Sequence, residues 1–318
     1  MNSAPEAIPA APPPRTDALA AYRIESDFLP AAHELRTAFD AHFDDPERAG
    51  PQHQVWNYWY VPDAYTYLRT LPEKVIGRPL AQTFHRQMVR HARERLGMDQ
   101  VSWPWLSLYV EGCGQTLHND SRNGAFGYVF SLTRWDGRPF TGGETLVFRE
   151  QDYWASGRFR EAGSGTDFYD LVPCRFNQLL MFDDRLIHAV PQVRGVTDPR
   201  AARVVLHGHV HVKEPFADGA LAPHLAALLA GPFGDLLQSA RQAAQREPGR
   251  WHGFATTAVE IAADGSVQAV RTLAQRVLGT QGPQAHVPVL NALQGALAQV
   301  RFPAQDGPSR IVVPLFFE

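Results

Sequence analysis

Three side chains near the middle of the chain have the types and spacing of a metal site: His118, Asp120 and His188. His118 and Asp120 are two residues apart, so at the end of a strand both side chains lean to the same side. Two imidazoles and one carboxylate on one face suit non-heme Fe(II), because the opposite coordination positions stay open. An H-x-D triplet alone is most often a surface loop, so the prediction depends on its context.

That context begins with an arginine and a run of alternating histidines. Arg203 opens a β-prone strand, and a guanidinium at the start of an inward-facing strand can grip a carboxylate bidentately. His207, His209 and His211 share its face, since side chains repeat every second residue. We expect His207 and His209 to shape the pocket or steer substrate, with buried histidines satisfied by hydrogen bonds as the alternative. His211 is expected near the exit.

Short strands must position these residues. Strands are predicted at 105–110, 127–132, 144–148, 178–182, 186–193 and 203–212, separated by Gly, Asp and Pro. This pattern of short strands is typical of an all-β sandwich or barrel over about residues 103–212. The tryptophans Trp56, Trp59, Trp103 and Trp105 are expected to be core residues.

The flanking segments differ from this β-rich region. Residues 1–18 are rich in Ala and Pro and are predicted to be a disordered tail. Helical apolar spacing predicts supporting helices at 30–43 and 79–96. Residues 215–318 are expected to form a separate α+β domain, with helices at 221–245 and 290–300, a hairpin at 257–271 and a last strand at 310–317.

Composition excludes several classes of function. The net charge of -3 gives no reason to expect nucleic acid or a membrane surface as a partner. No apolar run is long enough to span a bilayer. Cys113 and Cys174 have no metal-like spacing and indicate no disulfide framework. The N-terminus does not have the order of a secretory signal, so a cytoplasmic protein is expected.

The region from Tyr109 to about residue 210 resembles the Fe(II)/2-oxoglutarate-dependent oxygenases, most closely the prolyl-4-hydroxylase type. The matching segments are 109–115 (YVEGCGQ) before His118-Asn119-Asp120, 130–135 (FSLTRW), 141–145 (TGGET), 177–182 (NQLLMF), and His188-Ala189-Val190 with Arg203. They lie in the family's order over about a third of the chain. The resemblance implies a double-stranded β-helix (jelly roll) core, with the supporting helices and the C-terminal α+β domain outside it.

The resemblance also implies roles for single residues. His118, Asp120 and His188 would bind Fe(II), Arg203 would hold the distal carboxylate of 2-oxoglutarate, and Tyr109 would add a hydroxyl to that carboxylate. The segment before the arginine is longer than usual in the family, so Arg200 competes for the role. We favour Arg203 because a β-branched run follows it, whereas Arg200 lies in a Pro-led turn.

The implied reaction is hydroxylation of an aliphatic carbon, with release of succinate and CO2 and with ascorbate as a reductant. Halogenating relatives lack the carboxylate of the triad, so Asp120 favours hydroxylation. The expected substrate is an amino-acid, peptide or protein side chain. The alternatives are a catalytically silent jelly-roll binding protein and a cupin-like metalloenzyme that does not use 2-oxoglutarate.

The C-terminal region resembles, more weakly, the C-terminal domain of TonB-like proteins. The segments concerned are 259–270, 290–302 and 312–317. This resemblance suggests a protein partner that docks through the C-terminal domain. The alternative is a domain that only supports the barrel.

Overall fold

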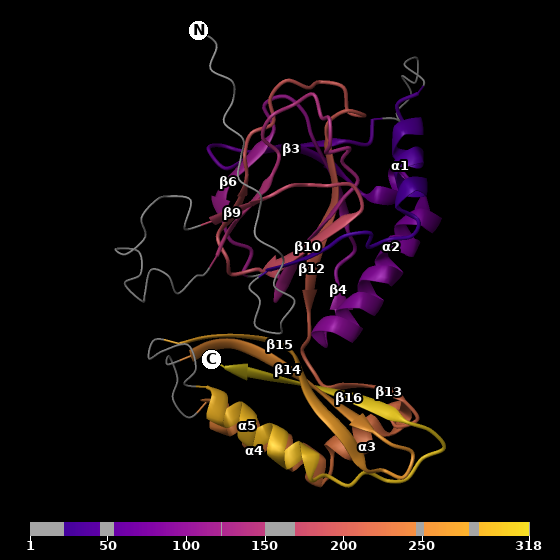
Figure 1. Cartoon of the computed structure of the whole chain (residues 1–318), viewed down its shortest axis with the longest axis vertical. Coiled ribbons are helices and arrows are strands. Elements are labelled where there is room, and N and C mark those ends of the chain that lie inside the picture. The colour runs from indigo at the N-terminus through magenta and orange to yellow at the C-terminus, as the bar shows by residue number, and fades with distance from the viewer. Residues whose placement is uncertain are drawn as a thin grey trace.

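The computed structural model describes residues 22–44, 54–121, 123–149, 169–245, 251–279 and 286–317. The predicted disordered tail, residues 1–18, lies outside these ranges. The described chain forms two antiparallel sheets, one of twelve strands and one of four. Figure 1 shows them along the long axis of the molecule, with the larger sheet above and the smaller one below. No helix among the described residues is long and apolar enough to cross a membrane.

The larger sheet curls into a jelly-roll core, as the sequence predicts. Its strands follow the order β1-β10-β7-β12-β5-β3-β6-β11-β8-β9, with β2 paired to β3 and β4 to β12. The strands are β1 Tyr22–Glu25, β2 Asn57–Val61, β3 Tyr65–Thr70, β4 Gln100–Val101, β5 Trp105–Tyr109, β6 Gly114–His118, β7 Phe126–Ser131, β8 Thr145–Phe148, β9 Tyr169–Val172, β10 Gln178–Asp183, β11 His188–Val190 and β12 Arg203–His211.

Strand β3 joins the two halves of this curled sheet. Its C-terminal part pairs with β5, and its N-terminal part pairs with β6, the strand that ends at His118. Across the interior, Val147 and Val172 from one half pack in one apolar cluster with Leu180 and Phe182 from the other. The two halves therefore face each other and enclose a space between them.

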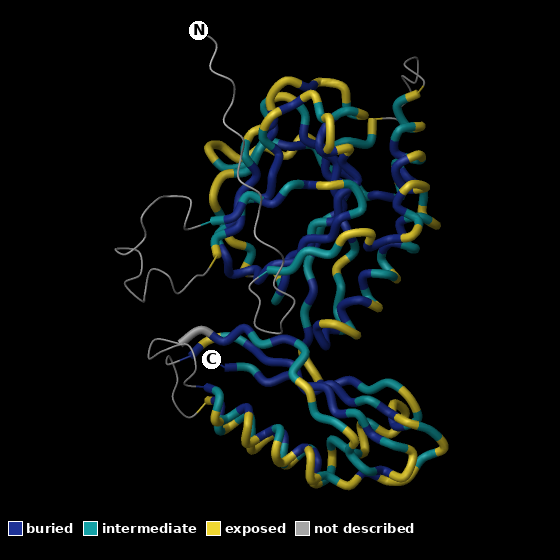
Figure 2. The backbone as a smooth tube through the Cα atoms, viewed as in Figure 1, coloured by how far each residue is buried: buried dark blue, intermediate teal, exposed yellow. Residues whose placement is uncertain are grey.

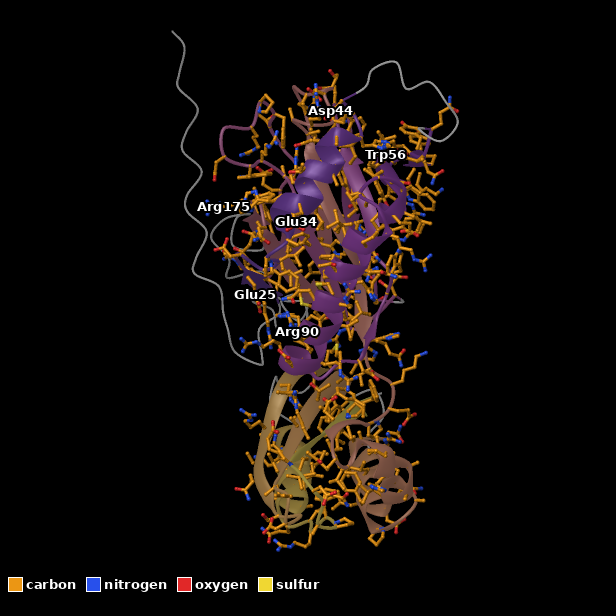
Figure 3. The ribbon with its side chains drawn as sticks, turned by 90° about the vertical axis from the view of Figure 1, so that its right-hand side faces the viewer. Glu25, Glu34, Asp44, Trp56, Arg90 and Arg175 are labelled. Carbon is orange, nitrogen blue, oxygen red and sulfur yellow. The ribbon has the colours of Figure 1, made fainter. Side chains whose placement is uncertain are left out.

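Two helices cover the outer face of the sheet, as Figures 1 and 3 show. They are α1 (Ala32–Ala41) and α2 (Arg78–His91), and a short 3-10 turn (Pro72–Lys74) precedes the second. Phe84 of α2 packs against Phe130 of β7 with ring centroids 5.1 Å apart. A π-helical turn (Ala92–Leu96) continues α2 and ends at Gly97 with φ +63°, the left-handed cap that glycine favours.

The smaller sheet belongs to the C-terminal region. Its order is β13-β16-β14-β15, and helices lie against one of its faces (Figure 1). The elements are β13 Phe216–Gly219, a 3-10 turn Ala222–His224, α3 Leu225–Leu229, α4 Pro232–Gln245, β14 Trp251–Ile261, β15 Val267–Gly279, α5 Val287–Ala298 and β16 Ser309–Phe317. The predicted domain boundary at 214/215 falls between β12 and β13.

The two central strands of the smaller sheet, β14 and β16, are largely buried on both faces and are mostly dark blue in Figure 2. Alternate side chains point to opposite faces of a strand. Ala255 and Val259 pack with the helices in one apolar cluster, whereas Phe254 and Ala258 belong to the core of the barrel. Phe254 meets Phe126 of β7 with ring centroids 5.7 Å apart. The C-terminal region therefore packs directly on the barrel.

Six strands were not predicted from the sequence: β1, β3, β4, β6, β9 and β13. Strands β3 (YTYLRT) and β6 (GQTLH) lack the apolar alternation by which a half-buried strand is recognised. The reason is physical: these strands turn polar and aromatic side chains toward the interior of the barrel. The predicted hairpin at 257–271 is also longer, because β14 and β15 extend over 11 and 13 residues.

Candidate metal centre and active-site cavity

The structure brings His118, Asp120 and His188 together. His118 ends β6, His188 begins β11, and the two residues are paired across these neighbouring strands. Their ring centroids are 4.2 Å apart, and Nε2 of His188 lies 3.4 Å from Oδ2 of Asp120. One ligand atom from each of the three residues lies within 4.8 Å of the other two. Asp120 and His188, which are 68 positions apart in the chain, thus belong with His118 to one potential metal site.

The Nδ1 atom of each imidazole is hydrogen-bonded to a backbone carbonyl. Nδ1 of His118 lies 2.7 Å from the carbonyl oxygen of Thr116, and Nδ1 of His188 lies 3.0 Å from that of Leu186. A carbonyl oxygen only accepts hydrogen bonds, so each Nδ1 carries a proton and each Nε2 is the ring nitrogen left to face the site. This is how metal-ligating histidines are usually oriented.

The charges of the triad also suit a cation. Burial lowers the pKa of His118, and the neighbouring His188 lowers it further, so His118 is neutral at pH 7. Burial raises the pKa of Asp120, but the hydrogen bond and charge of His188 outweigh this effect and bring the pKa below its usual value. Neutral imidazoles and an ionised carboxylate are the forms that bind metals.

Asp184 and His209 support the triad from behind. The backbone carbonyl of Asp184 accepts a hydrogen bond from the N–H of Asp120 at 2.8 Å. Its carboxylate lies 2.9 Å from Nδ1 of His209. Asp184 is fully buried, and burial raises its pKa to about 6. The sequence places two acidic residues at 183–184 but does not indicate which of them faces the site.

Arg203 lies inside the barrel, in the same cavity as the triad. Its side chain is 1% exposed, and its Nε and Nη1 have no hydrogen-bond partner among the described residues. Nη2 reaches Thr145 Oγ1 only at 3.4 Å, and the guanidinium carbon lies 4.3 Å from the centre of the Tyr109 ring. Such a buried, unsatisfied cation is costly unless an anion pairs with it.

Tyr109 is paired with Arg203 across β5 and β12 and is likewise buried. Its hydroxyl donates a hydrogen bond to Oε1 of Gln115 at 3.0 Å. Burial raises the pKa of Tyr109, so the phenol stays protonated and remains a hydrogen-bond donor. The predicted pair of Arg203 and Tyr109 therefore lies side by side.

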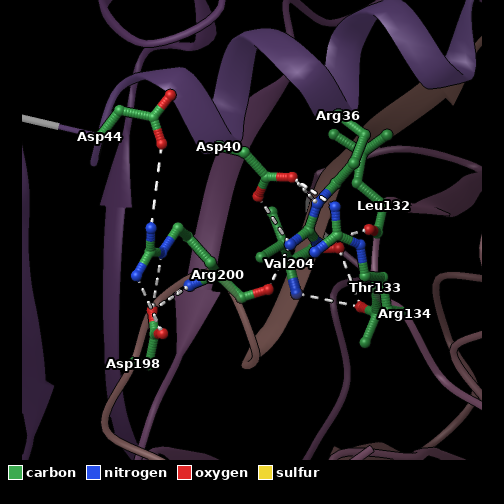
Figure 4. A network of polar contacts seen from close by, with 9 residues as sticks. All are labelled: Arg36, Asp40, Asp44, Leu132, Thr133, Arg134, Asp198, Arg200 and Val204. Carbon is green, nitrogen blue, oxygen red and sulfur yellow. Dashed lines mark hydrogen bonds and ion pairs between the residues drawn. The ribbon is translucent and has the colours of Figure 1, made fainter. Parts of the chain in front are cut away.

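Arg200 lies on the surface instead, with its side chain 46% exposed, and it takes part in the polar network of Figure 4. Its guanidinium contacts Asp198 at 3.3 Å and Asp44 at 3.8 Å, and its backbone carbonyl accepts a hydrogen bond from Arg36. Arg36 also donates to the carbonyl of Leu132 at 2.8 Å. Arg200 thus belongs to a network between α1 and the loop before β12, away from the cavity.

The three alternating histidines of β12 do not all reach the cavity. His207 and His209 line the cavity, and His211 is not among the described lining residues. Nε2 of His207 lies 2.8 Å from the hydroxyl of Ser107. Burial and the nearby charges of His209 and Arg203 lower the pKa of His207, so this imidazole is neutral.

The cavity that holds these residues has a volume of about 370 Å³. Its wall includes side chains that sequence reasoning did not place there: Tyr65, Tyr67, Arg69, Trp59, Trp103 and Trp105. The expectation of a core position is wrong for Trp59 and Trp105, whereas Trp56 and Trp103 pack against the core, and Trp103 lines the cavity as well. A signal was present in the alternation of Tyr65, Tyr67 and Arg69, which puts one aromatic-polar face on β3.

Comparison with known proteins finds similarity in structure alone. No protein-family model matches the chain, and no curated protein matches it. A prolyl-4-hydroxylase from Pseudomonas putida is 14% identical, with a TM-score of 0.42, over 61% of this chain and 94% of its own. The non-heme α-ketoglutarate-dependent epimerase SnoN from nogalamycin biosynthesis is 12% identical, with a TM-score of 0.40, over 59% and 76%.

AviO1 from Streptomyces viridochromogenes is 15% identical, with a TM-score of 0.41, over 60% of this chain and 89% of its own. At such identities and TM-scores these are similarities of shape, and the chemistry has to come from the residues of the site. α-Ketoglutarate is another name for 2-oxoglutarate. The chain is thus similar in shape to a prolyl-4-hydroxylase and to a non-heme α-ketoglutarate-dependent epimerase.

Proposed function

We propose that this protein is an Fe(II)/2-oxoglutarate-dependent dioxygenase that hydroxylates an aliphatic carbon, with release of succinate and CO2. One observation carries the proposal: the triad of His118, Asp120 and His188 opens into the same cavity as Arg203, a buried arginine with two unsatisfied nitrogens. A metal site without such a cation would not favour a dicarboxylate co-substrate. A buried cation without a metal site would not explain the triad.

The donor set fits Fe(II). Two neutral imidazole nitrogens and one hard carboxylate are typical of non-heme Fe(II) oxygenases. Neither Cys113 nor Cys174 is among the residues that line the cavity, so no soft thiolate competes for the metal. His118 and His188 both point Nε2 at the site because their Nδ1 atoms are held by carbonyl oxygens. Asp184 lies behind the triad and contacts His209 through its carboxylate, which supports this arrangement.

Arg203 fits the far carboxylate of 2-oxoglutarate. Its unsatisfied Nε and Nη1 are the donors that a carboxylate pairs with bidentately. The carboxylate would supply the counter-charge that the described residues around Arg203 lack. Thr145 lies within reach of the same carboxylate, and Tyr109 packs its ring on the guanidinium and limits its movement.

When bound, iron and 2-oxoglutarate supply an oxidant made from O2. The protein positions the reactants and limits the access of water. Tyr65 packs edge-on against His118 with ring centroids 5.0 Å apart, and Phe182 packs against His188 at 4.6 Å. These rings fix the imidazoles and shield them from solvent. We infer that the substrate enters past Trp59 and Trp105 and is an amino-acid, peptide or protein side chain.

The test is succinate release from 2-oxoglutarate with Fe(II), measured together with iron binding. The wild-type protein should bind one Fe(II) and release succinate, even slowly and without a substrate. His188→Ala should lose both, because a metal ligand is removed. A wild-type protein that binds no iron and releases no succinate would favour a silent binding protein. Iron binding without 2-oxoglutarate turnover would favour a cupin-like enzyme.

A matched pair of arginine variants tests the co-substrate site. Arg203→Ala should raise the 2-oxoglutarate concentration needed for half-maximal succinate release by roughly a hundredfold, since charged hydrogen bonds contribute about 1.5–3 kcal/mol each. Arg200→Ala should change it less than twofold, because Arg200 pairs with Asp198 on the surface. The reverse result would assign the carboxylate to Arg200.

A further inference from the structure

Arg69 is held between two tryptophan rings at the wall of the active-site cavity. Its guanidinium carbon lies 3.5 Å from the ring centre of Trp59 and 4.4 Å from that of Trp105. Stacking of this kind holds the plane of a guanidinium through its faces and leaves its N–H donors at the edge. Arg69 forms no ion pair with any carboxylate of the described residues. Its polar neighbour is the hydroxyl of Tyr67.

Arg69 shares a face of β3 with two residues of the catalytic cavity. Tyr65, Tyr67 and Arg69 alternate along the strand, so their side chains point the same way. Tyr65 packs on His118, and Tyr67 stacks on Tyr109 with ring centroids 5.2 Å apart. The triad and Arg69 thus lie along one wall. Tyr65, which contacts the triad, and Arg69 are four residues apart on the strand, so their Cα atoms are about 13 Å apart.

The charges of the cavity leave Arg69 without a counter-ion. The described lining residues include one carboxylate, Asp120, and two guanidinium groups, Arg69 and Arg203. Asp120 is used by the metal in the proposed function, and Arg203 by 2-oxoglutarate. The remaining cation at a partly desolvated site favours an anionic ligand, and a planar fork of donors matches a carboxylate.

The surrounding wall is aromatic. Trp59, Trp103 and Trp105 line the cavity together with Tyr67. The indole N–H of Trp103 is satisfied by Glu73 at 3.0 Å, so this ring adds an apolar surface. A ligand held here by Arg69 would place an apolar body against these rings.

We propose that Arg69 binds a carboxylate of the substrate, so that the substrate is a small carboxylic acid with an apolar body, such as an amino acid or the C-terminal residue of a peptide. This inference rests on the proposed function and narrows its substrate class. The acid end binds at the N–H edge of the Arg69 guanidinium, beside Trp59 and Trp105, and the other end reaches the metal triad. An internal side chain of a folded protein carries no such terminal carboxylate.

Acids and their matched amides test the inference without turnover. The probes are phenylacetate, 4-phenylbutyrate and N-acetylleucine, each with its carboxamide. They are titrated by calorimetry into protein saturated with Zn(II) and 2-oxoglutarate, so that Arg203 is already occupied. At least one acid should bind about tenfold more tightly than its amide, the gain expected of a charged hydrogen bond.

Four variants locate the preference for the acid. Arg69→Met should abolish it, and Arg69→Lys should reduce it, because a lysine keeps the charge but not the planar fork. Arg203→Met, with the 2-oxoglutarate concentration raised until this variant is also saturated, should keep it, which separates this site from the co-substrate site. Arg134→Met, at an arginine whose side chain is 63% exposed and paired with Asp40, is the matched control and should keep it too.

The inference is overturned if no acid of the panel is preferred over its amide by the wild-type protein, or if the preference survives in Arg69→Met. A preference lost in Arg203→Met but kept in Arg69→Met would show that the acids occupy the co-substrate site instead. Failure of the proposed function has a different signature, the absence of iron binding and of succinate release in the wild-type protein.

Discussion

Two buried arginines at opposite ends of the barrel strands differ in how their charge is satisfied. Arg185 follows β10 and pairs with the fully buried Asp183, which accepts hydrogen bonds from its Nε at 2.9 Å and its Nη2 at 2.6 Å. Arg276 of β15 donates to the same carboxylate at 3.0 Å. Arg203, by contrast, has a long hydrogen bond to Thr145 Oγ1 at 3.4 Å and stacks on the ring of Tyr109, with no carboxylate of the described residues beside it. Both arginines are buried. We call Asp183, Arg185 and Arg276 the complete cluster, because a carboxylate pairs with the two arginines, and Arg203 with Thr145 the incomplete cluster, because no carboxylate of the described residues pairs with Arg203.

The complete cluster joins the barrel to the C-terminal region. Arg185 donates from Nη1 to the carbonyl of His252 and from Nη2 to that of Arg276, both at 2.9 Å. These acceptors lie on β14 and β15. Because every donor of Arg185 has a partner, this cluster has a structural role. The incomplete cluster around Arg203 lacks an anion, and that difference distinguishes a binding site from a structural ion pair.

The largest expected effect is on the complete cluster. Asp183→Asn removes the charge that two buried arginines share, so the free energy of unfolding should fall by about 3–5 kcal/mol. Urea denaturation measures this change. Asp264→Asn is the control, since Asp264 is 64% exposed and lies 3.6 Å from Arg301. A loss below about 1 kcal/mol in Asp183→Asn would mean that the cluster is not structural.

The incomplete cluster should respond in the opposite way. Arg203→Met removes an unpaired buried charge, so the protein without ligand should unfold at the same or a higher urea concentration than the wild type. The wild-type protein loaded with Zn(II) should gain about 2.7 kcal/mol from 2-oxoglutarate at a hundred times its dissociation constant. Arg203→Met should gain almost nothing. Marked destabilisation of the unliganded variant would contradict a ligand-binding role.

The smallest effect is the response to acid. Burial raises the pKa of Asp183, but Arg185 and Arg276 outweigh this and hold the pKa below its usual value. A depressed carboxyl pKa contributes stability that is present above the unfolded value, about 3.9, and is lost as the pH falls through the folded value.

The wild-type protein should therefore lose stability below about pH 4 more steeply than Asp183→Asn. Arg203→Met should keep the wild-type slope, because no carboxylate of the described residues pairs with Arg203. Chemical denaturation between pH 3 and pH 6 measures both slopes. Equal slopes for the wild type and Asp183→Asn would show that Asp183 does not contribute in this way.

The barrel strands with long apolar runs were predictable, and two strands of the cavity wall, β3 and β6, were not. Strand β10 is buried throughout and strand β12 is mostly buried, so their apolar runs mark them in the sequence. Strands β3 and β6 carry polar and aromatic residues toward the cavity and were missed. Because these cavity-facing side chains are polar and aromatic, β3 and β6 lack the apolar periodicity by which a strand is recognised in the sequence.

The sequence by itself determined the local parts of the site. The two-residue spacing of His118 and Asp120, and the period-two face that joins Arg203 to His207 and His209, follow from strand geometry within a few residues. A short stretch of chain therefore carries enough information to place such side chains on one side of the backbone.

Only the tertiary structure decided which distant groups meet. It placed Arg203 in the cavity and Arg200 with Asp198 on the surface, and it paired Asp183 with Arg276, 93 residues further along the chain. It also joined β3 to both β5 and β6, which brought Arg69 into the cavity. Contacts of this kind depend on strand pairing and domain packing, which no local pattern of residues specifies.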